Sequence, residues 1–143
     1  MFEFLELSQL LHDLDVIKIY QFEIPDKRTQ KTKRKRIQKK IKHIINKYEI
    51  QHTHHEYERA LGNAIHHGKC PVECRLYIGS HHQLVFMIED HGYGFDYQRV
   101  LKQFHKGEVY YHYHGRGTQS YAENPCLCVD WKKKGRQIIL YYE

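Results

Sequence analysis

Long apolar runs are missing from the 143-residue sequence: none approaches the roughly 20 residues that a transmembrane helix needs. The first residues, Met1 to Glu6, carry acidic charge and lack the basic region that opens a signal peptide. We therefore expect a cytoplasmic protein, neither secreted nor inserted in a membrane, whose cysteines stay reduced.

Cysteine pairs with the spacing of common zinc sites are also missing. The four cysteines form two pairs, Cys70/Cys74 and Cys126/Cys128, and neither pair has two residues between its members as structural zinc sites usually do. The 13 histidines keep a zinc site open as a minor alternative. We interpret the cysteines as free thiols.

Acidic residues are absent from Lys27–Lys47, a segment that holds eleven of the 23 lysines and arginines. The rest of the chain has 12 basic against 17 acidic residues, so the basicity is local although the whole chain carries +6. Apolar residues recur there at helical spacing, which predicts an amphipathic helix from about Arg34 with a cationic outer surface. These apolar residues are Ile37, Ile41, Ile44, Ile45 and Tyr48.

A solvated outer face is the preferred interpretation of this basic helix, because most charge runs are solvated. The alternative is a docking surface for an acidic protein partner or for the phosphate backbone of a nucleic acid. Nucleic acid is the weaker of these two, since no aromatic residues interleave with the lysines as a base-stacking surface requires.

The length and the 41% hydrophobic content predict one domain over residues 1–143. Residues 1–15 form an N-terminal helical extension in this prediction, because four leucines keep the i, i+3, i+4, i+7 spacing of an amphipathic helix. They are Leu7, Leu10, Leu11 and Leu14. We expect this helix to pack on its own domain, with a homodimer or partner contact as the alternative.

The remaining pattern predicts an α/β domain. A strand is expected over Val16–Ile24, and a helix from Thr53 or His54 to His67, with Thr53 as N-cap and Glu56 completing a capping box. Further expected elements are a hairpin of strands 72–78 and 84–89, a helix over 97–104, a lid over 105–114, and a hairpin of strands 127–132 and 137–142. Together they predict a two-layer α/β sandwich, with a mixed, mostly antiparallel sheet covered on one face by the helices at 27–48 and 54–67.

Three short motifs stand in order along the chain. The helix ending at His67 carries Asn63 and is followed by Gly68, where a C′ glycine belongs. The second motif, Asp90-x-Gly92-x-Gly94, follows an apolar strand. The third, Gly115-Arg116-Gly117-Thr118, predicts the N-terminus of a short helix whose amides face an anion. An ordinary protein kinase is excluded, because nothing resembles a His-Arg-Asp loop or a Gly-rich loop followed by a strand lysine.

In this order the motifs resemble the GHKL superfamily, the histidine kinase-like ATP-binding domains, and within it the anti-sigma-factor serine/threonine kinases. The resemblance runs from about Ile19 to the C-terminus. It implies the Bergerat-type ATP-binding fold, with ATP and magnesium as cofactors. It places the metal at Asn63 and adenine recognition at Asp90. The other implied nucleotide-binding residues are His67, Gly92, Gly94, Gly115, Arg116, Gly117 and Thr118.

The chain departs from this family at one position. The resemblance implies a general-base glutamate four residues before Asn63, where this chain has Arg59. A guanidinium cannot act as a base, because its pKa lies above about 12. Glu56 and Glu58 are weak substitutes, since the first lies about 10 Å along the helix axis from Asn63 and the second points roughly 140° away.

Three functions stay open. We expect an ATP-binding regulatory protein that binds a sigma-like or antagonist-like partner in a nucleotide-dependent way, with phosphotransfer weak or lost. The first alternative is an active protein serine/threonine kinase. The second is a nucleic-acid-binding or adaptor protein that uses the basic helix 27–47.

Overall fold

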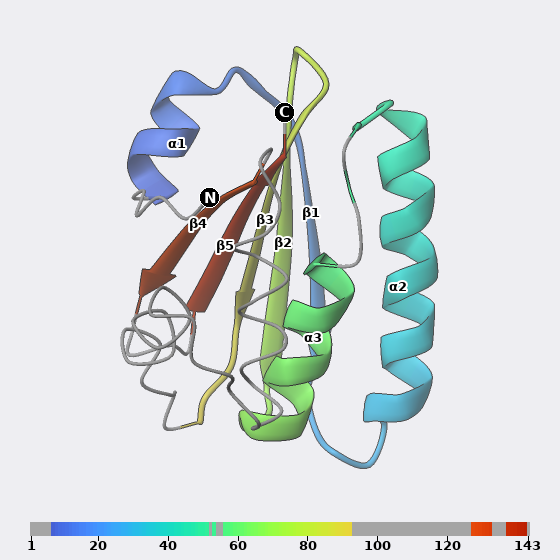
Figure 1. Cartoon of the computed structure of the whole chain (residues 1–143). Coiled ribbons are helices and arrows are strands. Elements are labelled where there is room, and N and C mark those ends of the chain that lie inside the picture. The colour runs from blue at the N-terminus through green and yellow to red at the C-terminus, as the bar shows by residue number, and fades with distance from the viewer. Residues whose placement is uncertain (1–6, 52, 54–55, 93–126, 133–136, 143) are drawn as a thin grey trace, which may run out of the picture.

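The structure is a computed structural model that describes residues 7–51, 53, 56–92, 127–132 and 137–142. Figure 1 shows the sheet standing between one short helix on one side and two longer helices on the other. In chain order the elements are α1 (Leu7–Asp13), β1 (Val16–Ile24), α2 (Gln30–Lys47), α3 (Glu56–His67), β2 (Val72–Gly79), β3 (Gln83–Glu89), β4 (Leu127–Lys132) and β5 (Gln137–Tyr142).

The five strands form one sheet in the order β1-β2-β3-β5-β4. Each of its four strand pairs is antiparallel. The central strand β3 pairs with β2 on one side and β5 on the other, so Ile88 lies opposite Cys74 and Ile138. Within the described residues the sheet is therefore wholly antiparallel, where the sequence predicted a mixed one.

The main core lies between one sheet face and the helices α2 and α3. Alternate residues of β2 and β3, such as Leu76 and Phe86, are fully buried on this face. Ile41 of α2 and Leu61 of α3 are fully buried against them. The predicted pairing of these two helices with one sheet face is confirmed, and so is the α/β class.

Helix α1 covers part of the opposite face (Figure 1). Its leucines pack on Val85, Met87 and Ile139, which point away from α2 and α3. The expectation that this helix packs on its own domain is confirmed. The prediction of helices on only one face was wrong, because strand residues on both faces of β3 are apolar and both faces need cover.

The start of one helix differs from the prediction. Helix α2 begins at Gln30, four residues before Arg34, and Asp26 Oδ1 accepts hydrogen bonds from the Thr29 N–H at 2.9 Å and hydroxyl at 3.0 Å. Helix α3 is described from Glu56 onward. Residues 54 and 55, which separate it from Thr53, lie outside the described part of the chain, so the predicted capping box stays a prediction. No helix in the described part of the chain is long and apolar enough to cross a membrane.

Candidate functional site

The end of α3 meets the loop that follows β3. The helix closes with a hydrogen bond from the Gly68 N–H to the Ala64 carbonyl at 3.0 Å. One residue later, the Lys69 carbonyl accepts a hydrogen bond from the His91 N–H at 2.8 Å. The structure thus brings together two of the three motifs found in the sequence.

Gly68 is the point of closest approach between these two segments. A Cβ at Gly68 would lie 2.2 Å from Cγ of Asp90 and 2.5 Å from the Ala64 carbonyl oxygen. The backbone of Gly68 is not left-handed, so the expected role as a C′ residue is wrong. The glycine is needed because any side chain would occupy the place of the Asp90 carboxyl group.

The side chain of Asp90 is held by a hydrogen bond within the loop that begins at this residue. Asp90 is buried, with 8% of the residue exposed, and its Oδ1 accepts a hydrogen bond from the Gly92 N–H at 2.6 Å. A Cβ at Gly92 would lie 2.9 Å from this oxygen and 3.0 Å from Cα of Gly68. The Gly92 N–H takes one of the about four acceptor positions that a carboxylate offers.

Helix α3 presents its polar residues away from the core. Tyr57, Leu61 and Ala64 are buried. Arg59 is exposed and Asn63 is half-buried, one helical turn apart on the side opposite Leu61. The face that Arg59 shares with Asn63 is therefore as the sequence predicted.

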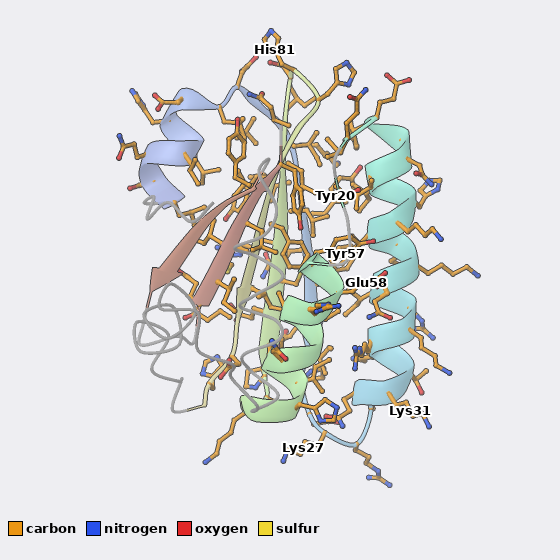
Figure 2. The ribbon with its side chains drawn as sticks, in the orientation of Figure 1. Tyr20, Lys27, Lys31, Tyr57, Glu58 and His81 are labelled. Carbon is orange, nitrogen blue, oxygen red and sulfur yellow. The ribbon has the colours of Figure 1, made fainter. Side chains whose placement is uncertain are left out.

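The Glu58 carboxylate lies on a different side of α3 from Arg59 and Asn63. Glu58 is half-buried on the side of α3 nearer to α2, while the adjacent Tyr57 points into the core (Figure 2). The expected separation of Glu58 from the face of Asn63 is confirmed by this placement. Glu56 and His67 are the first and last residues of α3, and their side chains are not among those described.

A second close approach joins α3 to α2. The guanidinium of Arg34 lies against Gly62, such that a Cβ there would come 2.8 Å from Nη2. Arg34 is half-buried, unlike most cations of α2. This contact was not predicted from the sequence. The sequence feature that could have indicated it is the position of Arg34 among the apolar residues of the predicted helix, on the face that packs against the core.

Cys70 borders the site. Burial raises the pKa of its thiol, and the nearby carboxylates of Asp26 and Asp90 raise this pKa further, against a smaller opposing effect of Lys27. Cys74 is buried in the sheet, which raises its pKa far above the ordinary value near 9. Both residues are free thiols, as expected, and a protonated thiol is a poor metal ligand.

Several predicted residues lie outside the described part of the chain: Gly94, Gly115, Arg116, Gly117, Thr118 and Cys126, with the expected helix 97–104 and lid 105–114. Among the described residues, no group of three or more histidine, cysteine or acidic side chains is placed to hold a metal. Magnesium at Asn63 stays a prediction.

A surface hollow of about 410 Å³ lies at the other end of the sheet, beside the C-terminus of α2. His82 Nδ1 and the Tyr48 carbonyl oxygen form a hydrogen bond of 3.0 Å at its edge. Figure 1 places the β2–β3 turn, which carries His82, at the opposite end of the sheet from the end of α3. This hollow is therefore separate from the Gly68–Asp90 site.

None of the family models, curated proteins or solved structures compared with this chain matches it. Three features of the site bear on its function. These are the contact between the α3 end and the β3 loop, the Asp90 carboxylate held within that contact, and the exposed Arg59 one turn from Asn63.

Proposed function

We propose that this protein binds ATP or ADP between α3 and the loop after β3, in a Bergerat-type fold, and that the bound nucleotide controls its association with a protein partner. The observation that carries the proposal is the contact of Gly68 and Gly92 with the Asp90 carboxyl group. Two sequence motifs that lie 22 residues apart meet there without an intervening side chain.

The residues present fit an adenine nucleotide. The Asp90 carboxylate, held by the Gly92 N–H, would accept a hydrogen bond from the adenine amino group. The glycines on both sides would let the base approach the backbone closely. The amide oxygen of half-buried Asn63 suits magnesium, an ion that prefers oxygen ligands and keeps several waters. Bound magnesium would neutralise phosphate charge.

Arg59 favours binding over turnover. Its exposed guanidinium shares a helix face with Asn63 and would pair with a phosphate group as a permanent cation. It cannot take a proton from an attacking hydroxyl group or water. We therefore place the function in nucleotide-dependent binding of a sigma-like or antagonist-like partner. An active serine/threonine kinase is the second candidate, and it requires a base from outside this helix face.

Isothermal titration calorimetry with ATP and ADP, with and without magnesium, tests the proposal. Asp90→Asn should weaken ATP binding by about 1.5 to 3 kcal/mol, the usual worth of a hydrogen bond to a charged group. Glu89→Gln is the matched control, because it removes a neighbouring carboxylate that contacts Gln137 at 3.4 Å on the other sheet face. Equal ATP affinities of wild type and Asp90→Asn, or no binding by wild type, would contradict the proposal.

A further inference from the structure

The outer surface of α2 is cationic on every side that the core leaves open. Successive residues of a helix are rotated by about 100° around its axis. The buried isoleucines of α2 therefore face the sheet, and one row of lysines lies along each side of the exposed, solvent-facing arc. Lys31, Lys35 and Lys42 form the first flank, and Lys33, Lys40 and Lys47 form the second. Between the flanks lie the exposed crest residues Thr32, Arg36, Lys39, His43 and Asn46.

The charges of α2 form no ion pairs within the described chain, although the pKa of the Asp26 carboxyl group, which hydrogen bonds already lower, is lowered further by nearby Lys33. Helix α2 contains no acidic residue, and none of its lysines or arginines forms an ion pair with another described residue. Lys40 and Lys47 lie over the rings of Phe22 and Tyr48, at 5.9 Å and 5.4 Å from the ring centres. These contacts hold the stems of two second-flank lysines while their charges stay near the surface.

Figure 2 shows nitrogen-tipped side chains, Lys31 among them, projecting from α2 away from the sheet. The exposed arc lacks apolar and aromatic side chains, which protein interfaces use as anchors, and lysine is depleted in such interfaces. It also lacks an apolar face for insertion into a lipid layer, because the isoleucines of α2 are buried in the core. A regular polyanion matches the surface better than either partner.

The dimensions favour duplex DNA among polyanions. An α-helix with its side chains is about 10–12 Å across, and the major groove of B-DNA is about 12 Å wide. Over 18 residues α2 extends about 27 Å, at 1.5 Å per residue. A helix lying in the groove would direct its two flanks at the phosphates on both walls and its polar crest at the base edges. The absence of aromatic residues argues against a single strand, not against a duplex.

We propose that α2 is a docking helix for the major groove of double-stranded DNA, with the two lysine flanks on the phosphate backbones. The groove of A-form RNA is too deep and narrow for this placement. The inference is independent of nucleotide binding at the Gly68–Asp90 site, because it uses the helix surface that faces away from the core.

Fluorescence anisotropy of a labelled 20-base-pair DNA, titrated with the full chain between 50 and 200 mM salt, tests the inference. Each phosphate contact adds about 0.9 to the slope of log Kobs against log salt concentration, so six flank lysines would give a slope of about −5.4. Lys35→Gln with Lys42→Gln should reduce the size of this slope by about 1.8 and weaken binding by roughly tenfold or more at 50 mM salt.

The matched control changes net charge by the same amount on the other side of the sheet. Ser8→Glu with Gln9→Glu places two negative charges on exposed positions of α1 and should leave the slope unchanged. An equal loss in the control would show that net charge alone attracts DNA and would overturn the proposal. So would undetectable duplex binding at 50 mM salt, or tighter binding to single-stranded DNA or to vesicles of anionic phospholipid.

Discussion

The N–H of His91 donates a hydrogen bond to the carbonyl oxygen of Lys69 at 2.8 Å. This backbone contact holds the chain that leaves α3 against the chain that leaves β3, and it does not depend on the side chain of either residue. The carboxyl group of Asp90 fills the space beside Gly68 that results. The local geometry of the candidate site therefore requires a glycine at position 68.

Gly68→Ala tests this requirement. A methyl group 2.2 Å from Asp90 Cγ cannot be accommodated without displacing the β3 loop. We expect a loss of about 1 to 3 kcal/mol in the free energy of unfolding, the usual cost of overpacking a close contact. Urea denaturation monitored by circular dichroism gives this value.

Gly62→Ala is the matched control, because the atom that its methyl group would meet is the flexible end of Arg34. Alanine is favoured over glycine in a helix interior by about 1 kcal/mol, so this variant should be unchanged or more stable. Equal destabilisation of the two variants would show that the Asp90 contact is no tighter than the Arg34 contact.

Cys74 should make stability fall at high pH. Burial raises its pKa in the folded state above the ordinary value near 9. The contribution of the buried thiol is therefore fully present below pH 9 and is lost as the unfolded chain ionises above it.

Relative to Cys74→Ala, the free energy of unfolding of wild type should drop above pH 9 by up to about 1.4 kcal/mol per pH unit. Chemical denaturation between pH 7 and 10.5 measures the difference. The difference between wild type and Cys74→Ala removes the contribution of other titrating groups, which both proteins share. One such group is Tyr20, whose pKa is raised mainly by its hydrogen bond with Tyr48. Parallel pH curves would contradict the assigned burial of the thiol.

Arg59→Glu should increase phosphate transfer or ATP hydrolysis. The substitution places a carboxylate on the exposed helix face one turn from Asn63, and a positioned general base contributes typically 10² to 10⁴-fold. We expect very slow or undetectable turnover by wild type. We also expect weaker ATP binding by the variant, because the new charge repels the phosphates.

Arg59→Gln is the control for this experiment, since it removes the cation without supplying a base. A rise in turnover with glutamate but not with glutamine supports the assigned role of the position. Turnover by wild type at about 1 s⁻¹ or more, an ordinary rate for an enzyme, would show that another group supplies the base.

Much of the secondary structure could be predicted from periodicity. Strand β1 has the predicted bounds Val16–Ile24, and both hairpins lie where the alternation of apolar residues placed them. These elements are local, because short turns fix the pairing of neighbouring strands. The start of α2 was predicted too late because the lysines before Arg34 carry no apolar signal, although they form helix well and Asp26 supports the turn before them.

The arrangement of the sheet and of the site could not be read from the sequence. Nothing in the local pattern shows that β5 pairs with β3, or that α1 covers the second face. The role of Gly68 was also misassigned: a glycine after a helix usually relieves a left-handed turn, whereas here it makes room for Asp90, a residue 22 positions later. Such contacts between distant segments depend on the packing of the whole chain.

The strand order has a consequence for how the chain is assembled during synthesis. Strand β5 is made after β4 yet lies inside the sheet, where it pairs with β3 across about 50 residues of intervening sequence. Until β5 emerges from the ribosome, β3 has a partner on one edge only and its apolar residues lack part of their cover. A nascent chain stalled before residue 137 should therefore expose an aggregation-prone edge at β3. A chaperone that binds such edges would have to protect β3 until β5 is made.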